Sequence, residues 1–172
     1  MAKPTIAAGF PKAFLDFAVS RGADPQTLIK RSNIRLDDLS EQDNRIPIVN
    51  YIALLKTGIE LCDEPALALL FGEAVSLTDI SIVGMLGVGG GNAEAVRQQI
   101  NRYVRLMLDE GDDQISDRIK FVRERDNVWL KFTSPIYIDN PLITESGFAR
   151  CVCGTRTIFN AKGISTNKTF PY

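Results

Sequence analysis

Apolar residues recur with the period of an α-helix through the first two thirds of the chain. Phe10, Phe14, Phe17 and Ala18 lie on one helical face and predict a helix over about 11–21, which Gly22 ends. The polar stretch "SNIRLDDLSEQDNR" predicts a connector with one short helical turn. Further predicted helices are a short one capped by Asp24 and begun by Pro25, one from Pro47 to about 62, "PALALLFGEAV" from Pro65, one at about 79–87, and a sixth that contains Val96 to Met107.

The spacing changes to a period of two after "DEGDD". Ile119, Phe121 and Arg123 alternate with polar neighbours, and "VWLKFTSPI" alternates again after a two-residue turn at Asp126 and Asn127. This pattern predicts an antiparallel β-hairpin over about 115–136. Asn140 and Pro141 then cap a long helix over about 141–161, which Gly163 ends.

The fold class predicted from these elements is α+β. A helix-rich N-terminal part over about 10–110 is followed by the hairpin or a small sheet and by a long helix near the C-terminus. A chain of 172 residues is long enough to bury one sizeable core, so we expect a single domain over 1–172.

Charge and composition narrow the classes of partner. The net charge is −1, hydrophobic residues make up 45% and charged residues 24%, which gives no basic excess to attract duplex DNA. No apolar run approaches the roughly 20 residues that span a bilayer, and the N-terminus lacks the apolar core of a secretory signal. We therefore expect a cytoplasmic protein that does not bind a membrane.

The chain contains no histidine, which removes the commonest general base and the commonest transition-metal ligand. Its three cysteines fit reduced thiols, and Cys151 and Cys153 lie two positions apart on a predicted helix, where side chains point to different faces. The carboxylates of "DEGDD" do not alternate as in a calcium loop, which favours a solvated turn. We expect no enzyme activity, no metal and no cofactor.

The stretch "GMLGVGGGNAEAV" at 84–96 has two interpretations. A dinucleotide-binding loop would need a preceding strand and a third glycine at the position of Asn92, and both are missing. A phosphate-binding P-loop would need a Gly-Lys-Ser or Gly-Lys-Thr ending, which is also missing. The free N–H groups of the next helix still leave anion binding open. The favoured interpretation is a joint between two helices, and the excess of glycine over Gly87–Gly91 suggests that this joint is a hinge.

The sixth predicted helix carries the best candidates for a binding site. Tyr103 lies at the centre of its apolar face and Gln99 at the edge, and the only tryptophan, Trp129, lies on a strand expected to pack near it. A buried tyrosine or glutamine requires a hydrogen-bond partner, which a small polar ligand in a cavity can provide. Pairing within the protein is the alternative.

The order of several short signals resembles a known family. These are "RGADPQTLIKRSNIRLDDLSEQDNRIPIVNYIAL", "IELCDEPALALLFGEAV" and "ISIVGMLGVGGGNAEAVRQQINRYVRLM". Together they resemble the N-terminal arabinose-binding-like domain of AraC-family bacterial transcription regulators, over about Phe10 to Phe159. The sequence departs from the family pattern at Asn33, where glycine is usual, at Gln42, where proline is frequent, and in "VGGGN".

The resemblance implies an effector-sensing or self-associating domain, most simply a homodimer, that acts on a C-terminal pair of helix-turn-helix units. That pair does not occur before Tyr172, so we expect DNA binding only through a domain outside this chain. The leading hypothesis is a small effector, such as an amino acid, sugar or organic acid, bound among the sixth helix, the hairpin and the last helix. Its expected contacts are Gln99, Tyr103 and Trp129, with Arg102 as the anchor for an anionic effector.

Two other hypotheses remain open at this point. In the first, the domain only dimerises and its interior is filled by side chains. In the second, the glycine-rich joint binds an anion or a nucleotide.

Overall fold

The computed structural model describes residues 3–81, 93–111 and 118–161 of the chain. Its N-terminal elements are β1 Thr5–Ala7, α1 Gly9–Ser20, α2 Pro25–Ser32, the 3-10 helix η1 Leu36–Leu39, β2 Arg45–Pro47, α3 Ile48–Cys62, α4 Leu67–Ala74 and α5 Leu77–Ile80. Its C-terminal elements are α7 Ala93–Met107, β3 Leu108–Asp109, β4 Ile119–Glu124, β5 Asn127–Phe132, α8 Pro135–Asp139 and α9 Pro141–Ala161. Helices dominate over two small antiparallel sheets, so the α+β prediction is confirmed.

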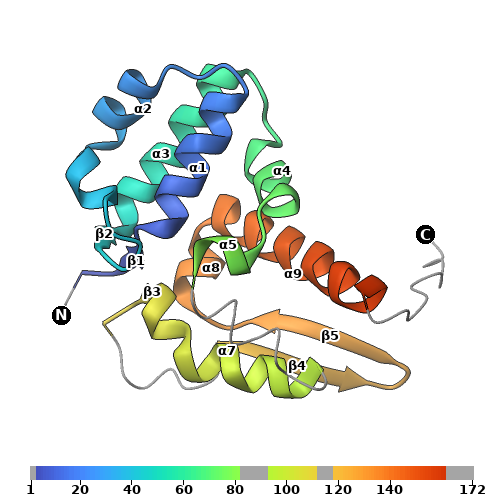
Figure 1. The fold of residues 1–172 in the computed structure, drawn as a ribbon. Helices are drawn as coiled ribbons and strands as arrows, with labels where there is room; N and C mark the ends of the chain where they lie inside the picture. The colour runs from blue at the N-terminus through green and yellow to red at the C-terminus, as the bar shows by residue number, and fades with distance from the viewer. Residues whose placement is uncertain (1–2, 82–92, 112–117, 162–172) are drawn as a thin grey trace.

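The helices form two groups with α9 between them. Helices α1, α2 and α3 lie together, α4 lies beside them, and α7 with the β4–β5 hairpin lies on the other side of α9 (Figure 1). Helix α9 makes its most extensive contact with α4. At their crossing Gly72 is required, because a Cβ there would lie 2.3 Å from the main-chain oxygen of Ser146.

The core of the first group is built around aromatic rings from α1 and α4. Phe14 and Phe71 are fully buried and meet edge to face, with ring centroids 5.3 Å apart. Gly58 of α3 faces Phe14, where a Cβ would approach the ring to 2.8 Å. Burial of a side chain as large as phenylalanine stabilises the fold by roughly 1.5–3 kcal/mol, so this contact fixes how α1, α3 and α4 pack.

A three-stranded sheet, which the sequence analysis did not predict, joins distant parts of the chain. Its strand order is β2-β1-β3, and Ile6 pairs with Ile46 on one side and with Leu108 on the other. The strands are two or three residues long, too short to show a period of two. The sheet holds the end of α7 against the N-terminus.

The hairpin is confirmed, but its turn lies one residue earlier than predicted. Glu124 pairs with Asn127, so Arg125 and Asp126 form the turn, and Arg125 has a positive φ of 54°. The prediction of Asp126 and Asn127 rested on their preference for turns, which the pairing register overrides.

The prediction that the hairpin extends to about 136 is wrong at its end. Strand β5 ends at Phe132, and the next residues begin a short helix, α8. Ser134 is the N-cap of α8 and Pro135 its first residue, a sequence signal typical of a helix start. The prediction is wrong because the alternation of apolar residues continues through "VWLKFTSPI" and indicates a strand up to its end.

The other helix predictions agree with the structure, except that the end predicted at Gly163 lies outside the described residues. The Asp24 carboxylate accepts a hydrogen bond from the Thr27 N–H at 2.7 Å, as expected for the cap of α2. Of the predicted helix at 79–87, only its first residues fall within the described part, where α5 spans Leu77–Ile80. The joint at Gly87–Gly91 lies outside the described residues. Among the described helices none is long and apolar enough to cross a membrane.

Candidate functional site

An arginine lies on the buried face of α9. Ile143, Ser146 and Arg150 occupy positions i, i+3 and i+7 of this helix, and the first two are buried. The Arg150 guanidinium donates from Nε to the Val75 main-chain oxygen at 3.2 Å and from Nη2 to the Ser146 Oγ at 3.3 Å. The charged Arg150 therefore occupies a position of α9 at which the helical pattern predicts an apolar residue.

Aromatic rings enclose this guanidinium. Its Cζ lies 5.0 Å from the ring centroid of Phe71 and 5.7 Å from that of Phe10, which is within range of cation–π attraction. Tyr51 and Tyr137 interact with it electrostatically. In the described part of the chain, Arg150 forms no ion pair with an aspartate or glutamate.

The acid–base properties of this cluster follow from its burial. Desolvation lowers the pKa of Arg150, raises that of Tyr137 to about 12, and raises those of Tyr51 and Cys151. A guanidinium keeps its charge at any physiological pH. The cluster thus contains one positive charge surrounded by neutral phenol and thiol groups.

Tyr137 connects the cluster to the surface. Its ring lies across Gly147 of α9, where a Cβ would approach Tyr137 Cε1 to 3.3 Å, and it stacks on Phe132 with centroids 4.5 Å apart. An open hollow of about 460 Å³ lies between β5, α8 and α9. Its lining is mostly apolar and consists of Leu130, Lys131, Phe132, Thr133, Tyr137, Ile138, Thr144 and Phe148.

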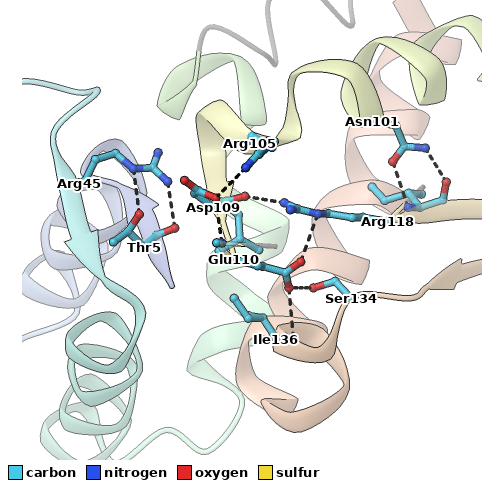
Figure 2. A network of polar contacts seen from close by, with 12 residues as sticks. Thr5, Arg45, Asn101, Arg105, Asp109, Glu110, Arg118, Ser134 and Ile136 are labelled. Atoms are coloured by element: carbon cyan, nitrogen blue, oxygen red, sulfur yellow. Dashed lines mark hydrogen bonds and ion pairs between the residues drawn. The ribbon is translucent and has the colours of Figure 1, made fainter. Parts of the chain in front are cut away.

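A buried ion pair lies at the start of α8. Arg118 is 0% exposed, its Nε lies 3.2 Å from Oε2 of Glu110, and its Nη1 donates to the Leu108 main-chain oxygen at 2.6 Å. Glu110 Oε1 accepts hydrogen bonds from the Ser134 hydroxyl and, at 3.4 Å, from the Ile136 N–H (Figure 2). The carboxylate therefore caps the start of α8 while it neutralises Arg118.

A side-chain amide attaches α7 to the hairpin. Asn101 accepts a hydrogen bond from the Ile119 N–H at 3.1 Å and donates to the Ile119 oxygen at 2.8 Å, as a neighbouring strand would. Arg45 completes the connection to the N-terminal sheet. It donates to both the side chain and the main chain of Thr5 (Figure 2). It also donates to the Leu106 main-chain oxygen at 2.8 Å. Polar contacts thus link β1, β2, α7, the hairpin and α8.

The four residues predicted from the sequence lie outside this cluster. On α7, Gln99 is half-buried, Tyr103 packs against the core, and the exposed Arg102 has its Cζ 5.5 Å from the Tyr103 ring centroid. Trp129 lies on β5 opposite Val122 and is 51% exposed. The hydrogen bonds between α7 and the hairpin come instead from Asn101 and Arg97 to Ile119. The role of the four residues in binding stays a prediction.

Sequence reasoning missed the residues that carry the buried charges. A signal for Arg150 existed, because it follows Ile143 and Ser146 at helical spacing on a face that must be buried. Glu110 had no such signal, since it lies inside "DEGDD", which looks like a solvated turn. Arg118 lies beside the alternating residues of β4, and only the folded structure shows that it points inward.

The donor chemistry within the described ranges does not form a metal site. No group of three or more His, Cys, Asp or Glu side chains gathers there. Cys62, Cys151 and Cys153 form no disulfide bond.

Comparison with known proteins identifies the family. The family profile described as the arabinose-binding domain of AraC transcription regulators, N-terminal, matches residues 22–168. The chain is also 24% identical over 102 residues to the ornithine utilization regulator of Pseudomonas aeruginosa. That alignment covers 59% of this chain and 30% of the relative's length. The chain therefore belongs to the family of N-terminal arabinose-binding domains of AraC transcription regulators.

Proposed function

We propose that the domain senses a small effector in the cytoplasm and modulates DNA binding by a helix-turn-helix domain of the full regulator. The observation that carries the proposal is the family match over residues 22–168. The domain does no chemistry in this proposal and acts only by binding. The ornithine utilization regulator that it resembles is a regulator by name, which agrees with this role.

The proposed binding place is the open hollow between β5, α8 and α9. A volume of about 460 Å³ lies within the range of small-molecule sites, and an apolar lining with a few polar groups is typical of them. This location lies among two of the three elements expected from the sequence, the hairpin and the last helix. Gln99, Arg102, Tyr103 and Trp129 define a competing place on α7 and β5.

The structure offers a physical route by which occupancy can alter the domain. Tyr137 lines the hollow, and it belongs to α8, whose first turn is held by Glu110. Glu110 is in turn paired with Arg118 at the start of β4, so a displaced α8 disturbs the support of the hairpin and of α7. A ligand that binds one arrangement of these elements more tightly shifts the population toward it.

Thermal-shift and calorimetric titration with amino acids, sugars and organic acids tests the proposal. A ligand present at 100 times its Kd stabilises the native state by about 2.7 kcal/mol, which raises Tm by roughly 5–10 °C in a domain of this size. Phe148→Ala, in the hollow, should weaken the response, whereas Tyr103→Ala should not. The opposite pattern would move the site to α7, and no response to any compound class would argue against effector sensing.

Self-association is a second candidate function because the hairpin exposes large apolar residues. Phe121 is 42%, Val128 64% and Trp129 51% exposed. The strand pairing puts Phe121 and Val128 on one face of the hairpin and Trp129 on the other, so each face presents exposed apolar side chains that a partner could cover. Light scattering tests this candidate: a homodimer that Trp129→Lys dissociates would support it, and a monomer at high concentration would reject it.

A further inference from the structure

Arg118 is fully buried and Arg150 is partly buried, and of these two arginines only Arg118 is neutralised within the described residues. Arg118 is paired with Glu110 at 3.2 Å. Arg150 has a main-chain oxygen, a serine hydroxyl and aromatic rings around it, but forms no ion pair with a described carboxylate. Enclosed charges in proteins are normally paired, because burial of an isolated charge is costly.

The groups around Arg150 are suited to one small anion. Its Nη1 makes no hydrogen bond in the described part of the chain, and neither do the hydroxyls of Tyr51 and Tyr137. All three are donors that a carboxylate can accept from. Since burial raises the pKa of both phenols, each keeps its proton at neutral pH.

We infer that the effector of this domain is a small carboxylate, whose charge is bound by Arg150 with the Tyr51 and Tyr137 hydroxyls and whose apolar body occupies the hollow beside Tyr137. The inference rests on the proposed effector-sensing function and adds the chemical class of the ligand. The family assignment does not select Arg150.

The charge count favours a monocarboxylate over a phosphate. Arg150 supplies a single positive charge, so a dianion would leave one negative charge uncompensated among Phe10, Phe71 and the two tyrosines. The mostly apolar lining of the hollow suits a hydrocarbon or aromatic body, with Thr144 and Lys131 as polar groups. A compound with a neutral amide in place of the carboxylate loses the ionic contact and keeps the apolar one.

Matched pairs of compounds test this class. Butyrate and benzoate are titrated against butyramide and benzamide by calorimetry and thermal shift, with inorganic phosphate as a separate arm. We expect at least one carboxylate to bind and its amide to bind at least about 30-fold more weakly, since removal of one partner of an enclosed charge pair has an effect of this size. Equal binding of acid and amide, or binding of phosphate alone, would overturn the inference.

Variants connect the binding to Arg150. Arg150→Met should reduce carboxylate affinity at least about 30-fold, Arg150→Lys should retain part of it, and Tyr137→Phe should reduce it about 2- to 10-fold. The exposed Arg123→Met serves as the control and should bind as the unmodified chain does, while Arg102→Met tests the competing place on α7. Circular dichroism checks the fold, and if Arg150→Met does not fold, the Lys and Tyr137→Phe variants carry the test.

The outcomes separate this inference from the function on which it rests. A sugar or other neutral compound that stabilises the chain and Arg150→Met equally would leave effector sensing in place and reject the carboxylate. Loss of carboxylate binding in Arg102→Met, with Arg150→Met unaffected, would move the anion site to α7 and also reject it. No binding by any carboxylate would contradict the inference, whereas the proposed function fails only if every compound class is inert.

Discussion

The buried pair between Glu110 and Arg118 makes a sharp prediction about stability. Arg118 is 0% exposed and the Glu110 side chain 6% exposed, so a variant that removes one charge leaves the other enclosed and unpaired. Loss of one partner of a buried pair costs roughly 3–5 kcal/mol. We therefore expect Glu110→Gln and Arg118→Met each to lower the free energy of unfolding by about 3 kcal/mol or more.

The double variant Glu110→Gln with Arg118→Met should be more stable than either single variant. It contains no unpaired charge, and methionine occupies much of the volume of the arginine stem. What it still loses is the bond to the Leu108 oxygen, worth about 1 kcal/mol, and the charge at the start of α8. The two effects should therefore be non-additive by about 2 kcal/mol or more.

Urea unfolding followed by circular dichroism measures these free energies, with thermal unfolding as a second readout. For a domain of this size 1 kcal/mol changes Tm by roughly 2–4 °C, so each single variant should lose about 6 °C or more. The ion pair between Lys131 and Glu124 is a matched control within the same chain. Both of its side chains are more than half exposed and 3.8 Å apart, so Lys131→Met should cost less than about 1 kcal/mol.

The reasoning would be refuted by two single variants that each cost less than 1 kcal/mol, or by effects that simply add in the double variant. Either result would mean that water reaches the pair and screens it, contrary to its burial. A double variant as unstable as the worse single one would instead show that the hydrogen bonds of the pair, and not its charges, hold α8.

Three further variants test other contacts of the fold. Gly72→Ala should destabilise the domain by about 1–3 kcal/mol in urea unfolding, because the new Cβ would lie 2.3 Å from the Ser146 main-chain oxygen. Gly154→Ala is the control: its Cβ would meet nothing within 4 Å, so this variant should be neutral or stabilising. Asn101→Ala removes both hydrogen bonds to the Ile119 main chain, so hydrogen exchange should show faster exchange of the Ile119 amide; unchanged exchange would contradict this contact. Because the pKa of Tyr137 is about 12 when folded and 10 ordinarily, its contribution is complete below pH 10 and is lost as the pH rises toward 12. That contribution is at most about 3 kcal/mol, and a Tyr137→Phe variant should lack this part of the pH dependence.

The sequence predicted those parts of the fold that depend on local patterns. The helix α1 was predictable because one of its faces packs against α3 and α4. The apolar residues on that face, Phe10, Phe14 and Phe17, therefore recur in the sequence with the period of a helix. The cap at Asp24 was predictable for a similar reason, since its bond reaches only to Thr27. Local signals of this kind suffice where the partner residues are close in sequence.

The three-stranded sheet and the site depend on contacts between distant residues. Ile6, Ile46 and Leu108 pair across about a hundred positions, and no local pattern indicates that they meet. The same holds for Glu110, which looks like part of a solvated acidic turn until Arg118 and the start of α8 are placed against it. Polar residues in a predicted loop therefore say little about burial when their partners come from other elements.

Arg118 and Arg150 also lead to opposite expectations about ligands. Arg118 has its counter-charge within the chain, so an added anion has no unpaired charge to neutralise there and should not stabilise the fold through it. Arg150 is partly buried without a described acid, so an anion that binds there offsets part of the free-energy cost of its desolvation. The unliganded fold therefore favours anion binding for two reasons. The anion neutralises the unpaired charge of Arg150, and it also adds new contacts. Tyr137 interacts electrostatically with Arg150 and belongs to α8, the helix whose first turn is held by Glu110. Neutralisation of Arg150 by an anion therefore affects α8, which connects most directly to the hairpin and α7.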